Sequence, residues 1–235
     1  MASISSIITN PTTWAVAIGT LPSLIWLIFW QRLDRERREP LGLIMLCFLL
    51  GAASVFLATF IQNMLQSSIT TPGHRIIAWA SVEEFIKFGV FYFVAYKSGQ
   101  DDDALDPAMY LIAVALGFAA LENIFYVLKP AASFNVTASL LTGGLRFFGS
   151  TLLHTIASCF IGICITLSPR WMRFIGIFLG IGGAIFLHST FNFFILQNTT
   201  ASFLQVYGYL WIVAIISHVI LEKFRRYPPG ALASV

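Results

Sequence analysis

Seven runs of mainly apolar residues, separated by short polar stretches, dominate this sequence. Each run is close to the roughly 20 residues that a helix needs to cross a bilayer. The predicted spans are Trp14–Trp30, Leu41–Gln62, Ile76–Tyr96, Ala108–Leu128, Phe147–Leu167, Phe174–Leu196 and Phe203–Leu221. The helix-stopping residues between them include Pro40, Pro72, Pro107, Pro130 and Pro169. The sequence therefore predicts an all-α, polytopic membrane protein, a bundle of about seven transmembrane helices.

The composition agrees with a lipid environment. The chain is 57% hydrophobic and 11% charged, whereas a soluble domain has roughly 25% charged residues. The net charge of +3 does not indicate a nucleic-acid partner, because the basic residues lie in loops beside the spans and form no single patch. Without a long linker or a low-complexity tract, we expect one domain over residues 1–235, with its site region at about 75–197.

Lysine and arginine residues in the loops predict the orientation. With the N-terminus outside, ten of them face the cytoplasm: Arg32, Arg35, Arg37, Arg38, Lys97, Arg170, Arg173, Lys223, Arg225 and Arg226. Three face the outside: Arg75, Lys129 and Arg146. Because cytoplasmic loops carry an excess of basic residues, we expect an outside N-terminus and a cytoplasmic C-terminus in a multi-pass protein of the plasma membrane.

Several ionisable side chains lie inside the apolar runs, where a charged residue costs about 2.5–3.5 kcal/mol on insertion scales. They are Glu83, Glu84, Lys87, Glu122, His154 and His188. In the predicted orientation, the glutamates and histidines all lie roughly 10–14 Å below the outer surface, at 1.5 Å rise per residue. Four spans thus bring ionisable groups to one depth. We therefore expect a single polar site in the outer half of the membrane.

The spacing of Glu83, Glu84 and Lys87 places them near one another on the third span. The lysine is four residues from one glutamate and three from the other, so it can reach either. Two adjacent carboxylates in a low dielectric do not both ionise easily, and a lysine helps one of them to stay charged. This combination suits a general base, although a purely structural ion pair has the same spacing.

Two further pairs place polar groups beside this candidate site. His188 and Asn192 are four residues apart and share a helix face, while Asn123 follows Glu122 directly. A single buried histidine usually forms only an interhelical hydrogen bond. Two histidines at the depth of three carboxylates favour a reaction site instead.

Four short motifs occur in order along the chain, each on its own span. They are Glu83-Glu84-Phe-Ile-Lys87, Gly117-Phe118-Ala-Ala-Leu-Glu122-Asn123, His154 in Leu-Leu-His-Thr, and His188-Ser-Thr-Phe-Asn192. Together they resemble the PrsW family of intramembrane proteases, which is related to the type II CAAX prenyl proteases and to bacterial immunity-type membrane proteins. The first motif alone is common in helices, whereas all four in this order are specific.

The resemblance implies hydrolysis of a peptide bond in a single-span, membrane-anchored protein, such as an anti-sigma factor, near the extracytoplasmic face. The implied catalytic residues are Glu83, Glu84, Glu122, His154, His188 and Asn192, with Lys87 and Asn123 in support. Two mechanisms remain open. In the first, a glutamate assisted by His154 activates water, and Asn192 or His188 stabilises the oxyanion. In the second, His154, His188 and Glu84 hold a divalent metal such as zinc that activates the water.

Two other classes of protein have similar sequence features. A proton-coupled transporter also carries intramembrane carboxylates, a lysine and histidines. Against it, the spans show no inverted repeat, and the ionisable groups gather at one depth. A non-catalytic relative that binds partners through the same bundle is the third reading, and the intact glutamates and histidines argue against it.

Overall fold

The computed structural model describes residues 10–32, 39–97, 99, 103–133, 137, 144–197 and 199–226. The basic residues Arg35, Arg37 and Arg38 and the side chain of Lys129, used above to predict orientation, lie outside the described part. Within the described ranges the regular elements are helices and no strand occurs. The all-α prediction is confirmed.

Seven long helices occur in the described residues. They are α2 (Pro11–Gln31), α3 (Leu41–Gln66), α4 (Pro72–Phe91), α5 (Asp106–Ala132), α7 (Ser150–Leu167), α8 (Arg173–Gln197) and α9 (Thr200–Arg225). A π-helical turn, η1 (Tyr92–Tyr96), continues α4, and a 3-10 turn, η2 (Arg170–Met172), precedes α8. A short helical segment over residues 144–148 leads into α7.

Local chemistry explains several helix ends. The side chain of Asn10 accepts a hydrogen bond from the backbone of Thr12 at 2.9 Å and so caps α2. Thr199 and Ser202 form a reciprocal capping box at the start of α9. The predicted break at Pro130 was wrong, because α5 continues to Ala132. A proline in the last turn removes one hydrogen-bond donor but does not end the helix at that residue.

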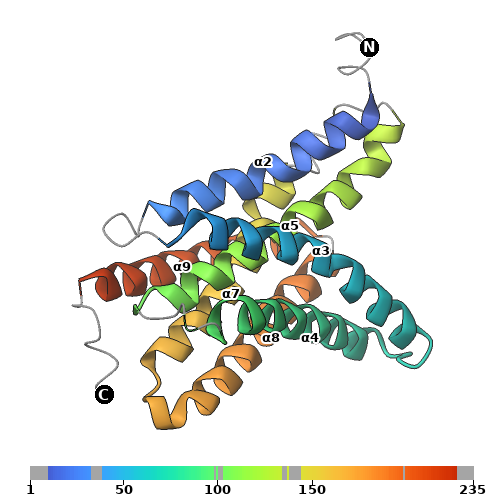
Figure 1. Ribbon diagram of the computed structural model, residues 1–235. Helices are drawn as coiled ribbons and strands as arrows, with labels where there is room; N and C mark the ends of the chain where they lie inside the picture. The colour runs from blue at the N-terminus through green and yellow to red at the C-terminus, as the bar shows by residue number, and fades with distance from the viewer. Residues whose placement is uncertain are drawn as a thin grey trace.

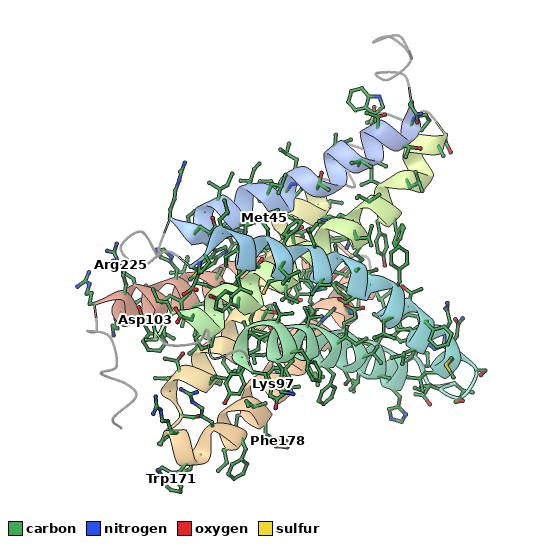
Figure 2. All side chains as sticks on the ribbon, in the orientation of Figure 1. Met45, Lys97, Asp103, Trp171, Phe178 and Arg225 are labelled. Carbon is green, nitrogen blue, oxygen red and sulfur yellow. The ribbon has the colours of Figure 1, made fainter. Side chains whose placement is uncertain are left out.

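Six segments are long and apolar enough to cross a membrane. They are Pro11–Gln31, Leu41–Gln66, Asp106–Leu128, Gly144–Leu167, Arg170–Gln197 and Thr200–Arg225. The helix α4 is not among them, since Glu83, Glu84 and Lys87 lie in its second half. Six of the seven predicted spans are thus supported, and the span at α4 is not. Large apolar side chains such as Phe178 point outward from the bundle, as lipid contact requires (Figure 2).

Two helices form the centre of the bundle. In Figure 1, α5 runs through the middle, and it packs against α2, α3 and α7. Residues 105–120 of this region are all buried, as are residues 150–159 of α7. The pair α4 and α8 pack together on the side of the bundle away from α2 (Figure 1). The site residues therefore come from two central helices and two flanking ones.

Close backbone contacts fix α5 against α3. A Cβ atom at Gly51 would overlap the carbonyl group of Val114, and one at Gly117 would overlap that of Phe48. Small residues at such positions allow membrane helices to approach closely. The middle of α5 is thereby held in a fixed place, one turn before Glu122.

Candidate active site

The helix α4 supplies a buried ion pair. Lys87 Nζ donates to Glu84 Oε1 at 2.6 Å, and both side chains are fully buried. The lysine also lies 5.3 Å from the centre of the Phe118 ring. Because two buried charges are costly unless they are paired, this contact makes it possible for α4 to carry a lysine inside the bundle.

His188, from α8, contacts both glutamates of α4. Its Nδ1 atom lies 2.7 Å from Glu84 Oε1, and its Nε2 atom lies 3.7 Å from Glu83 Oε2. The Glu84 carboxylate is thus shared between a lysine and a histidine. Such a contact fixes the orientation of the imidazole ring.

His154, from α7, joins α4 to α5. Its Nδ1 atom lies 3.0 Å from Lys87 Nζ, and its Nε2 atom lies 3.1 Å from Glu122 Oε2. Because an ammonium group has only donors, Nδ1 accepts and Nε2 carries the proton donated to Glu122. The two histidine rings meet edge to face, with their centres 5.0 Å apart.

Arg146, in the segment that leads into α7, holds the α5 residues in place. Its Nη2 atom donates to Glu122 Oε2 at 2.5 Å and to Ser150 Oγ at 2.8 Å. Its Nε atom donates to Asn123 Oδ1, and Asn123 Nδ2 donates to Thr151 Oγ1 at 2.9 Å. Asn123 therefore links α5 to α7 and has a supporting place in the site.

Gln62, near the end of α3, completes the cluster from the other side. Its Nε2 atom donates to Glu83 Oε1 at 2.9 Å. Continuous contacts now run from Arg146 through Glu122, His154, Lys87, Glu84, His188 and Glu83 to Gln62. The structure thus brings five of the six predicted catalytic residues together.

Asn192 is the predicted residue that stays apart. It is half-buried on α8, one turn beyond His188. Within the described part of the chain it forms no hydrogen bond with the cluster. Its side chain is free to meet a bound group.

The sequence analysis did not identify Arg146 and Gln62 as site residues. The analysis placed Arg146 in a loop on the outer side and Gln62 at the end of the second predicted span. One signal pointed to Arg146, which lies eight residues before His154, close to two helical turns. The spacing puts both on the same side of a helix that begins before Phe147.

The three glutamates of the cluster differ in their positively charged partners. Glu84 contacts Lys87 and Glu122 contacts Arg146. Glu83 contacts neither a lysine nor an arginine in the described residues, and its Oε2 atom is buried without a hydrogen-bond partner. An unpaired carboxylate in a buried site is expensive. Glu84 Oε2 is likewise buried without a hydrogen bond, so what distinguishes Glu83 is that it contacts no lysine or arginine in the described residues.

A divalent metal would find suitable donors here. Glu83, His154 and His188 each offer a ligand atom, and these atoms lie within 4.8 Å of one another. Two imidazoles and one carboxylate match a catalytic zinc site, and the unpartnered oxygen of Glu83 fits a cation. The sequence predicted Glu84 as the carboxylate ligand, whereas the structure offers Glu83. Glu84 Oε1 already contacts Lys87 and His188. To bind the metal, His154 would lose its contact with either Lys87 or Glu122.

Comparisons with known proteins identify the family of this chain. The family described as PrsW family intramembrane metalloprotease matches residues 39–219. Protease PrsW of Geobacillus kaustophilus is 33% identical over 129 residues, which are 54% of this chain and 57% of that protein. Protease PrsW of Oceanobacillus iheyensis is 32% identical over 152 residues, or 60% and 70% of the two chains.

A third relative aligns over most of its length. Protease PrsW of Clostridioides difficile is 24% identical over 220 residues, which are 89% of this chain and 90% of that protein. The match to the Geobacillus protein, by contrast, spans little more than half of that protein's length. No solved structure matches this chain.

Proposed function

This chain belongs to the PrsW family of intramembrane metalloproteases, and from that premise we propose that it hydrolyses a peptide bond of a membrane-anchored protein. The observation that carries the proposal is the buried cluster, in which Glu83 lacks a cationic partner while the other two carboxylates have one. A site with that arrangement supplies a reactive carboxylate beside two imidazoles.

Glu83 has the central role in this proposal. Its side chain is 11% exposed, against 0% for Glu84, so it lies nearer the surface of the bundle, although its Oε2 atom is itself buried. Its Oε2 atom accepts a proton from the water that attacks the peptide carbonyl carbon, and the proton passes to the leaving nitrogen as the C–N bond breaks. Gln62 holds the other oxygen of this carboxylate.

A divalent metal, if bound, would be held by Glu83, His154 and His188 and would supply a Lewis acid that polarises water and carbonyl oxygen. Glu83 is essential in either case, as proton acceptor or as ligand. Glu84 and Lys87 orient His188 and His154 through their hydrogen bonds.

The remaining predicted residues have positioning or stabilising roles. Arg146 and Asn123 hold Glu122, and Glu122 fixes the proton on His154 Nε2. Asn192, one turn from His188, donates from its amide to the oxyanion that forms on the carbonyl oxygen. The assignment rests on its position and on its unused hydrogen-bonding capacity.

We further propose that α4 crosses the membrane as a seventh span, within a single domain that covers residues 1–235. Glu83, Glu84 and Lys87 face partners on α3, α7 and α8, so its lipid-facing surface can remain apolar. The positive-inside bias places the N-terminus outside and the C-terminus in the cytoplasm. In Figure 2, Arg225, assigned to the cytoplasmic side, lies at the same end of the bundle as Asp103, which precedes α5.

This topology puts the cluster in the outer half of the membrane, and it specifies the substrate. A helical peptide bond is shielded by its backbone hydrogen bonds, so a substrate span must fray before water can attack. Fraying costs least near a helix end. The proposed substrate is therefore a single-span membrane protein, cut at or just inside its extracytoplasmic end. The resemblance to the PrsW family implies a protein of the anti-sigma-factor kind.

The test is hydrolysis by the purified protein in lipid vesicles. The probe is a single-span peptide with Gly-Pro near its extracytoplasmic end, incubated with and without a chelator, and the products are mapped by mass spectrometry. We expect one cut near the Gly-Pro. Loss of the cut with chelator, and its return with zinc, would assign the metal mechanism. Proton flux without any cut would instead identify a transporter and overturn the proposal.

A further inference from the structure

A groove lies on the surface of the bundle between the first turns of α4 and the outer half of α8. It is a cavity of about 550 Å³, within the roughly 300–1,000 Å³ of typical ligand pockets. Its walls include Gly73 and Ile77 of α4 and Gly182, Phe186 and Ser189 of α8. We call it the α4–α8 groove.

The groove and the catalytic cluster share two helices. The groove is formed by α4 and α8, which carry Glu83 and His188, although neither of these residues lines it. On α8, the lining residue Ser189 directly follows His188. A chain bound along this face of α8 therefore comes within one residue, along the helix, of the imidazole that contacts both glutamates.

One polar atom in the groove wall has no partner. Ser189 Oγ is buried and forms no hydrogen bond in the described structure, although a helical serine commonly bonds to the carbonyl group one turn earlier. Thr190, the next residue, also lines the groove. A lipid acyl chain has no group that could use these hydroxyls, whereas the backbone of a frayed peptide has both donors and acceptors.

The length and openness of the groove suit a helix. The lining face of α8 extends from Gly182 to Phe193, which at 1.5 Å per residue is roughly 16 Å. That is about half of the 30 Å hydrocarbon core. A Cβ atom at Gly182 or at Gly73 would meet nothing within 4 Å. The missing side chains leave room for another backbone to come close.

We propose that the α4–α8 groove is the docking site for the transmembrane segment of the substrate. The apolar walls bind the outer half of the substrate helix, and Ser189, next to His188 in the chain, turns its buried hydroxyl into the groove to bond to the substrate backbone where it frays. The inference rests on the proposed protease function and adds the route by which the substrate enters. It also predicts that a small residue on the substrate helix faces α8.

A second cavity provides a comparison. A cleft of about 380 Å³ between α2 and α9 is lined by Trp26, Phe29, Trp211 and their neighbours. No described residue of α4 or α8 lines it. If the substrate bound wherever the bundle offers an apolar hollow, it would bind here as well.

The chain offers a matched pair of variants for the test. Gly182 in α8 and Gly208 in α9 are both exposed and helical, and neither has an atom within 4 Å of a built Cβ. Gly182→Leu fills the α4–α8 groove, while Gly208→Leu places the same side chain on a surface outside it. Neither residue belongs to the catalytic cluster. Ser189→Ala removes the unpartnered hydroxyl without adding volume.

The probe is the same single-span peptide, carrying photo-leucine along its outer half, in vesicles with the full-length protein. After illumination, we expect cross-links to α8 residues 182–193 and to the first turns of α4. Gly182→Leu should lower the cross-linking yield and raise KM by about tenfold with kcat little changed, as expected when binding is lost. Gly208→Leu should stay within about twofold. Ser189→Ala should have an intermediate effect.

Two results separate this inference from the proposed function. Cross-links on α2 and α9, or an unchanged yield in Gly182→Leu, overturn the docking site even if the peptide is cut. Cross-links in the groove without any cut by the wild-type protein leave the docking site standing and refute the protease. Cross-links to surrounding lipid alone show an acyl-chain groove and also overturn the inference.

Discussion

Glu122 and Glu83 are both glutamates of one buried cluster, yet their partners differ. Glu122 accepts hydrogen bonds from Arg146 and from His154. Glu83 accepts one from the neutral amide of Gln62, and its second oxygen has no hydrogen bond, only the longer contact with His188. Glu122 thus contacts an arginine, whereas Glu83 contacts no lysine or arginine in the described residues. This difference supports the proposed division of roles, in which Glu122 positions and Glu83 reacts.

The comparison predicts the largest effect at Glu83. Glu83→Gln keeps the shape and the contact with Gln62 but can neither accept a proton nor bind a metal well. We expect kcat to fall by about 10²–10⁴-fold with insertion and folding intact, since that is the usual contribution of a general base. The measurement is hydrolysis of the single-span peptide. If Glu84→Gln is inactive and Glu83→Gln is active, the two roles are reversed.

Lys87→Met tests the buried ion pair of α4. The change leaves Glu84 buried without its cation, which should destabilise the protein by about 3–5 kcal/mol. Unfolding by heat or by denaturant, carried out in detergent, measures the loss of stability. The double variant Lys87→Met/Glu84→Gln is the control, and it should recover much of the stability without recovering activity. Equal stability of the wild-type protein and the single variant would contradict the assigned pair.

Arg146→Gln tests the arginine contact of Glu122. Glu122 would lose its cation and hold His154 less firmly, and a loss of about 10–100-fold in kcat is typical when such an outer partner is removed. KM should change little, because the groove is not touched. Arg146→Lys should recover part of the activity. Glu122→Gln should have a similar effect, and the double variant should be no worse than either single one. Additive losses would show that the two residues act separately.

Gln62→Leu should have the smallest effect. It removes one neutral hydrogen bond to Glu83, worth about 0.5–1.5 kcal/mol net, so kcat/KM should fall several-fold. Titrating zinc into the apoprotein, with calorimetry as the readout, shows whether the same bond also matters for metal binding. A loss as large as that of Glu83→Gln would mean that Gln62 touches the substrate itself.

The sequence was sufficient for the helices and for five of the residues that meet at the site, Glu83, Glu84, Glu122, His154 and His188. Apolar runs of bilayer length predict helices regardless of tertiary contacts, and buried charges must meet one another because lipid cannot solvate them. The reach of Lys87 to Glu84 followed from spacing along one helix. These features depend on local periodicity, which a single sequence contains.

Contacts between helices were the part that could not be predicted. Arg146 and Gln62 lie near helix ends, where a polar residue usually faces water. Their contacts with Glu122 and Glu83 depend on how α7 and α3 are rotated and where they begin. The choice of Glu83 over Glu84 as a metal donor also depends on which carboxylate already contacts Lys87 and His188. Spacing within α4 does not decide that.

The charged α4 helix also has a consequence for how the protein is made. Its glutamates and lysine would each cost about 2.5–3.5 kcal/mol if the helix entered the bilayer alone. Lys87 and Glu84 pair within α4, and Gln62 precedes Glu83, but the histidine partners are synthesised later: His154 comes 67 residues after Lys87, and His188 comes 104 residues after Glu84. If α4 is the proposed seventh span, we therefore expect it not to be released into lipid as soon as it leaves the ribosome. It would instead be retained at the translocon, or enter late, until α8 has been translated.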